Sequence, residues 1–284
     1  MIRARTPLVL ALALLGCHPK GGKTETPDDG KKDDGPPKVV IDDSVKQEPD
    51  PPQLAEAQSK YLAGEYEGVV SLLQPLYDDL KTRNQYRASA LAATWLTLAH
   101  AEQVFENGKE PSEWAAAMAE ATADTDVAAA AKLARGAYLI GDQEFATAAA
   151  TLDEAAKAAK TPSLAALAHV LRAEALINGA FAGGEDESLQ HPEMLDQAKA
   201  AYDAAAALTK GDDTLSLLLA RVHEGYAALA NYRKQRDEVC NQATVAIQLY
   251  AAKGATRLVQ VPAELASDNK CPLPPEATAS AGAG

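Results

Sequence analysis

The 284-residue chain has few of the residues that build small disulfide-rich domains or that carry most metal and nucleophile chemistry. Its three cysteines cannot form a disulfide-dense scaffold. Its five histidines are scattered singly, and none lies in a His-Glu-x-x-His, His-x-His or Cys-x-x-Cys pattern. No Gly-x-Ser-x-Gly elbow and no phosphate-binding glycine loop is present. We therefore expect no catalytic residue, no metal, no cofactor and no enzymatic activity.

Positive charge is also in short supply. The chain has 27 Lys and Arg against 40 Asp and Glu, which gives a formal net charge of −13. Such a surface does not collect phosphates, so nucleic acid is not an expected partner. Aromatic residues make up only 5%, but a hydrophobic share of 47% is enough for one or two packed domains.

The N-terminus carries a short apolar segment. Arg3 and Arg5 precede an apolar run over residues 7–15, which as a helix would span about 14 Å, against about 30 Å for a bilayer core. A basic start, a short apolar core and small residues after it are typical of a secretory signal peptide, which we assign to residues 1–16. No later stretch approaches 18 uninterrupted strongly apolar residues.

The residues after this run, Leu14-Leu15-Gly16-Cys17, resemble the lipobox of bacterial lipoproteins. This resemblance implies that Cys17 is the first residue of the mature chain and carries a diacylglycerol and usually a further acyl chain. Two or three acyl chains hold a protein on a bilayer essentially permanently. His18 follows the cysteine where an aspartate would resemble an inner-membrane retention signal, so we expect the periplasmic face of the outer membrane. The alternative is an ordinary signal peptide with a coincidental cysteine.

Residues 17–52 read as a tether. Between residues 18 and 52 there are seven prolines, four glycines, six lysines, nine acidic residues and no aromatic residue. Such a segment cannot bury enough surface to offset its ordering entropy, so we expect it to be disordered. As a flexible coil it would span roughly 30 to 35 Å.

Helical periodicity dominates residues 53–267, so we predict an all-α domain there. Leu91, Trp95, Leu98 and Phe105 fall on one stripe of a helix expected to begin near Asn84. The sequence also marks helix ends: it predicts that a helix starts at Thr161-Pro162, that helices end at Gly211 and Gly254, and that Pro75 kinks or ends its helix.

Parts of this domain resemble the tetratricopeptide repeat, in which a Gly-x-Tyr turn joins two antiparallel helices. Three segments carry the resemblance: Gly64-Glu65-Tyr66 with Val69, Leu73 and Leu76; Gly141 to Phe145 with Ala148, Leu152 and Ala155; and Ala198, Tyr202 and Ala205. Their spacings depart from the 34-residue period of that family. The resemblance implies an array of antiparallel helix hairpins, whose turn positions Gly64, Tyr66, Gly141, Phe145 and Tyr202 pack between helices.

By the same resemblance, the chain is expected to be a membrane-anchored envelope scaffold that binds a protein or peptide partner along the concave face of the array. An alternative is a helical envelope enzyme or ligand-binding protein, which predicts an acidic pocket with converging carboxylates. A third is an alanine-rich spacer with no tight partner.

With Cys17 set aside as lipidated, Cys240 and Cys271 remain, an even number in a compartment where disulfides form. We expect them to be bridged, with closure entropy on the order of 3 to 4 kcal/mol, rather than to be two unpaired thiols. The bridge would hold residues 268–284, which otherwise read as a disordered tail, against the last long helix.

Overall fold

The computed structural model describes residues 41–42, 44–183 and 188–280. Its elements are all helical and no strand occurs among the described residues, which confirms the all-α prediction. The α-helices are α1 (Pro52–Leu62), α2 (Tyr66–Thr82), α3 (Tyr86–Ala101), α4 (Lys109–Thr122), α5 (Thr125–Gly141), α6 (Phe145–Ala158), α7 (Pro162–Phe181), α8 (Pro192–Thr209), α9 (Ser216–Tyr232), α10 (Arg236–Ala252), α11 (Gln260–Asp268) and α12 (Pro275–Ser280). Three 3-10 turns are interspersed: η1 (Phe105–Gly108), η2 (Asp213–Leu215) and η3 (Thr256–Val259).

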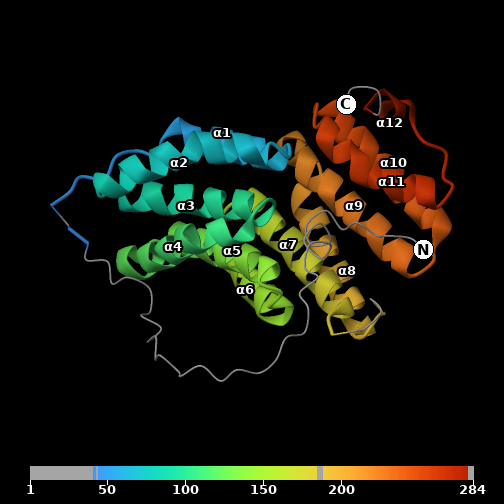
Figure 1. The fold of residues 1–284 in the computed structure, drawn as a ribbon, viewed down its shortest axis with the longest axis horizontal. Helices are drawn as coiled ribbons and strands as arrows, with labels where there is room; N and C mark the ends of the chain where they lie inside the picture. The colour runs from blue at the N-terminus through green and yellow to red at the C-terminus, as the bar shows by residue number, and fades with distance from the viewer. Residues whose placement is uncertain (1–40, 43, 184–187, 281–284) are drawn as a thin grey trace, which may run out of the picture.

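The helices pack in neighbouring antiparallel pairs that follow the chain, and Figure 1 shows the succession from α1 to α12. Alanine favours the helix and lets neighbouring helices approach closely. Alanine and leucine also form many of the apolar stripes that the pairs bury against each other. Other apolar residues contribute as well: in α2, Val69, Leu73 and Tyr77 recur at a spacing of four and are fully buried. The expected array of helix hairpins is therefore present.

One turn conformation recurs at the helix junctions. In each instance a left-handed residue with φ between 55° and 77° donates its N–H to the carbonyl three residues back, and the next N–H reaches the carbonyl five residues back. This is the Schellman arrangement that satisfies the last carbonyls of a helix. The left-handed residues are Gly64, Asn84, Gln143, Lys234, Gly254 and Lys270.

Several predicted helix limits hold and others are wrong. α7 starts at Pro162, and Gly211 and Gly254 lie just after α8 and α10 with positive φ. However, α2 does not end at Pro75 but continues to Thr82, so only a kink remains of that prediction. Phe105 is not on the helix of Leu98 either, because α3 ends at Ala101 and Phe105 begins η1.

Helix α7 is the one described helix that is long and apolar enough to cross a membrane by length and composition, although no such stretch was expected from the sequence. Two thirds of that window, 67%, is buried inside the protein. α7 lies between α6 and α8 and contacts both along its length, so its apolar character is accounted for by the core of the array.

The ordered body extends beyond the predicted tether boundary. Residues 44–51, assigned to the tether, lie against the junction of α2 and α3 and form a strap there. Gln85 Nε2 donates to the Lys46 carbonyl at 3.2 Å, and the Glu48 N–H donates to Gln85 Oε1 at 2.7 Å. Arg83 and Arg87 pair with Glu48 at 3.0 Å and Asp50 at 3.2 Å. Composition alone did not show this, because the partners of the strap lie about 35 residues away in the sequence.

The predicted tail is also wrong over most of its length. α11 ends at Asp268, a disulfide joins Cys240 to Cys271, and α12 follows. Ala277 of α12 is buried against the cluster that contains Tyr250 and Val259. The bridge therefore fixes a short structured segment on α10 rather than a disordered tail.

Candidate functional site

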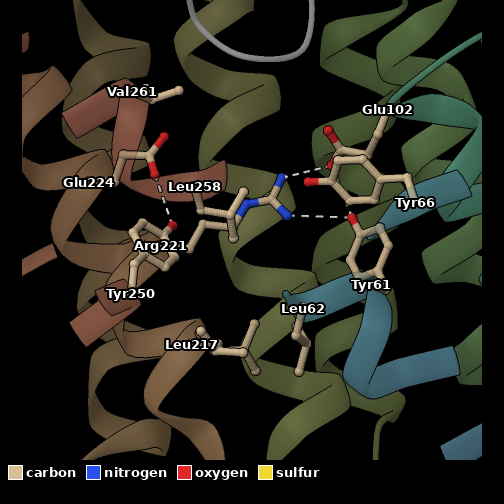
Figure 2. Close-up of a pocket in the computed structure, with 11 residues that line it drawn as sticks. Tyr61, Leu62, Tyr66, Glu102, Leu217, Arg221, Glu224, Tyr250, Leu258 and Val261 are labelled. Atoms are coloured by element: carbon tan, nitrogen blue, oxygen red, sulfur yellow. Dashed lines mark hydrogen bonds and ion pairs between the residues drawn. The ribbon is translucent and has the colours of Figure 1, made fainter. Parts of the chain in front are cut away.

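A network of charged and phenolic side chains occupies the centre of the array, where helices distant in sequence meet. Arg221 of α9 extends toward Tyr61 of α1 and Glu102 at the end of α3 (Figure 2), and it also pairs with Glu174 of α7. Figure 1 shows the end of α1 beside α9, and the Leu258 side chain fills the space next to Gly64. The first helix pair thus returns to the C-terminal helices and closes the array around this network.

The Arg221 guanidinium is fixed by hydrogen bonds to two carboxylates. Arg221 Nε and Nη2 donate to the two carboxylate oxygens of Glu174 at 2.7 and 2.9 Å, which is a bidentate pair. Nη2 also donates to Glu102 Oε1 at 3.1 Å, and that oxygen accepts from the Tyr61 hydroxyl at the same distance. The Arg221, Glu102 and Glu174 side chains are 17%, 4% and 16% exposed, so the charges are largely removed from water.

Burial and ion pairing shift the pKa values of these groups in opposite directions. Burial raises the pKa of Glu102, and the Arg221 guanidinium opposes that shift. Burial lowers the pKa of Arg221, but Glu174, Tyr61 and Glu102 outweigh it and raise the pKa well above its usual range. The guanidinium therefore stays charged and needs its carboxylate partners.

A third carboxyl, Glu224, lies one turn from Arg221 on α9. Its Oε2 accepts a hydrogen bond of 2.8 Å from the Tyr250 hydroxyl of α10 (Figure 2). Burial raises the pKa of Glu224 to about 7, a shift that Tyr250 and Arg221 oppose and that Glu174 and Glu102 reinforce. Two carboxyls thus contact Arg221 and a third lies nearby, and the raised pKa of Glu224 reduces the excess of negative charge near neutral pH.

The network borders a cavity of about 40 Å³. Its lining is mixed aromatic, aliphatic and charged: Tyr61, Leu62, Tyr66, Glu102, Leu217, Leu218, Arg221, Glu224, Tyr250, Leu258 and Val261. Sites for metabolites usually measure about 300–1,000 Å³. The cavity therefore brings carboxylates together, as the enzyme alternative expected, but has room only for water-sized molecules in this conformation.

The raised pKa of Glu224 predicts a pH effect on stability. The folded protein keeps this proton up to about pH 7, whereas an unfolded glutamate loses it near pH 4.3. Stability should therefore fall as the pH rises through this window. We expect Glu224→Gln to remove that loss, so that its stability relative to the natural protein increases by roughly 3 kcal/mol between pH 4 and pH 8.

Urea unfolding at a series of pH values measures this difference. Glu120→Gln, at an exposed position of α4, is the matched control and should give no such trend. Parallel stability curves for Glu224→Gln and the natural protein would show that Glu224 titrates as an ordinary glutamate.

The residues predicted to pack at the repeat turns lie in several different environments. Gly64 is the left-handed residue of its turn, and Tyr66 begins α2 with its ring 5.5 Å from that of Tyr61. Phe145 begins α6 and is buried, while Tyr202 is buried within α8 against α9.

Gly141 lies just before its turn and packs closely at that junction. It is the last residue of α5, where a side chain would meet the Phe105 ring, and the left-handed residue of that turn is Gln143. Cys17 lies outside the described residues. Among those residues no group of three or more His, Cys, Asp or Glu side chains is arranged to hold a metal ion.

Sequence reasoning missed the central network. Arg221 and Glu174 each interrupt an apolar helical stretch, in 215–222 and 164–181 respectively, and this was the available signal, because a charge inside an apolar stretch needs a partner. Their pairing depends on how strongly the array curves, which the sequence pattern does not specify. No protein-family model matches this chain, and no curated protein or solved structure shows significant similarity to it.

Proposed function

We propose that this protein is a lipid-anchored scaffold of the bacterial envelope that binds a protein partner through its helical array. The observation that carries the proposal is the array itself: stacked helix pairs whose central cavity, about 40 Å³, is too small for a metabolite. Arrays of this kind present extended surfaces for proteins and peptides.

Two further observations support the compartment and the anchor. The disulfide between Cys240 and Cys271 is typical of an oxidising, exported location. The Leu14-Leu15-Gly16-Cys17 motif supports lipidation of Cys17 and retention at the periplasmic face of the outer membrane.

The outer surface offers an open groove where a partner could bind. It measures about 270 Å³ and lies between α6, α7 and α8. Ala149 and Leu176 line its apolar part, and Arg172, paired with Asp153 at 2.6 Å, lines its polar part.

Site-specific photo-crosslinking in the native cells tests the scaffold proposal. The photoreactive residue is placed at Gln197, on the rim of this groove, and at Glu67, near the junction of α2 and η3. We expect a discrete adduct with one envelope protein from at least one of these positions. Recovery of only abundant neighbours, equally from every position, would contradict a scaffold role.

The anchor is tested separately. Cys17→Ala should abolish labelling by a fatty-acid probe and move the protein from the membrane to the soluble fraction, because no acyl chain remains. Unchanged labelling of this variant would refute lipidation at Cys17.

A further inference from the structure

The surface that holds the Arg221 guanidinium has the composition of an arginine-binding site. Glu174 offers two oxygens in fork geometry, Glu102 adds a second carboxylate, and the Tyr61 hydroxyl lies 3.4 Å from Arg221 Nη1. A planar guanidinium matches such a fork, whereas the compact ammonium of a lysine does not. Figure 2 shows the Tyr61 and Glu102 side chains at the end of the Arg221 side chain.

This acceptor surface and its arginine belong to different parts of the array. Tyr61, Glu102 and Glu174 come from α1, the end of α3 and α7, whereas Arg221 comes from α9, which packs mainly on α8 and α10 and less extensively on α7. α1 and α9 meet through side chains at this network rather than along their backbones. A cavity of about 40 Å³ lies beside the network at this junction.

In an open array of this type, the inner helices would present polar side chains to a partner. Here Arg221 occupies the acceptors that Tyr61, Glu102 and Glu174 present. Arg221 is the cation that pairs with both Glu102 and Glu174 among the described residues. Without Arg221 the acceptor surface would hold two carboxylates that have lost this cation.

We propose that the acceptor surface of Tyr61, Glu102 and Glu174 binds an arginine side chain of a partner protein, and that Arg221 fills it while the partner is absent. This inference rests on the proposed scaffold function and names the chemistry of the partner. The charge of the acceptor surface selects a cation, and its fork geometry selects a guanidinium. Binding requires α9 to move away from α1 and α7, so Arg221 acts as an internal competitor.

The test compares the natural protein with Arg221→Met in calorimetric titrations with a tetra-arginine and a tetra-lysine peptide. At about 150 mM salt, where exposed charges are screened over about 8 Å, we expect Arg221→Met to bind tetra-arginine about tenfold tighter than the natural protein does. Tetra-lysine should bind this variant about tenfold more weakly than tetra-arginine, because it lacks the planar fork.

Two further variants separate the site from general attraction to an acidic protein. Adding Glu174→Gln to Arg221→Met should abolish the gain, whereas adding the exposed Glu120→Gln, with the same change of charge, should retain it. Circular dichroism checks the fold; if Arg221→Met is not folded, Arg221→Gln replaces it with the same expectations. Equal affinity for the natural protein and the variant, a gain that survives Glu174→Gln, or equal binding of both peptides would overturn the proposal.

The two proposals fail in different experiments. Capture of an envelope partner by photo-crosslinking, with no gain in arginine binding by Arg221→Met, leaves the scaffold and removes the arginine site. A gain in arginine binding by Arg221→Met without any captured partner supports the arginine site and contradicts the scaffold role.

Discussion

Replacement of Arg221 by methionine should lower the free energy of unfolding by about 3 to 5 kcal/mol, the range measured when one member of a buried ion pair is removed. Methionine fills much of the space of the arginine stem, so the loss comes mainly from the charges that remain. Glu102 and Glu174 would keep side chains that are 4% and 16% exposed but would lose the cation that both of them contact. Chemical unfolding with urea, which does not compete for a guanidinium site, measures the effect.

A matched control lies just beyond the end of the same helix. Arg233 pairs with Asp196, whose side chain is 83% exposed, and Arg233→Met should cost less than about 1 kcal/mol because exposed pairs contribute little.

A second control neutralises the whole network. Adding Glu102→Gln and Glu174→Gln to Arg221→Met should recover at least half of the lost stability, since no buried charge is then left unpaired. A small effect for Arg221→Met, or no recovery in the triple variant, would mean that water enters the junction freely and that the array is not closed by this network.

The sequence predicts the helices of this protein better than it predicts the turns between them. Helical periodicity is a local property, so the long alanine-rich and leucine-rich stretches are enough to predict the all-α array. Six of the turns depend on one left-handed residue each. Gly64 and Gly254 are visible as glycines, but Asn84, Gln143 and Lys234 adopt the same φ region without being glycine. At the turn after α5 the glycine in the sequence is Gly141, but the left-handed residue is Gln143.

The central site is the part that the sequence predicts least. Arg221 and Tyr61 are 160 residues apart, and Arg221 and Glu102 are 119 apart. Local sequence patterns determine which face of a helix a side chain lies on. Whether α1 contacts α9, however, depends on the summed crossing angles of all the helix pairs between them. The strap of residues 44–51 was missed for a similar reason, because its order comes from Arg83, Gln85 and Arg87 rather than from its own composition.

The close approach of α8 and α9 also depends on a residue that the repeat resemblance did not single out. Gly225 of α9 faces the Tyr202 ring of α8, which is buried with 2% of its surface exposed. A Cβ atom at residue 225 would lie 2.5 Å from Tyr202 Cε2 and still closer to Cζ and the hydroxyl oxygen. Since real Cβ atoms essentially never approach within 3.0 Å of another heavy atom, the ring or the helix must move.

Gly225→Ala should therefore destabilise the protein by about 3 kcal/mol or more, at the upper end of the usual cost of overpacking. Alanine has the higher helix propensity by about 1 kcal/mol, so propensity alone predicts the opposite sign. Gly108→Ala is the control, because its φ is −78° and a Cβ there would come no closer than 3.4 Å to the Thr97 carbonyl oxygen; we expect a change within about 0.5 kcal/mol.

Thermal and urea unfolding of both variants distinguish packing from propensity. In the background of Tyr202→Leu, which removes the ring atoms that the new methyl group would meet, Gly225→Ala should lose most of its cost. An equal cost in both backgrounds would place the effect elsewhere on α9. A stabilised Gly225→Ala would mean that α8 and α9 lie farther apart than the contact between Gly225 and Tyr202 indicates, and the junction that holds Arg221 against Glu174 would then be looser as well.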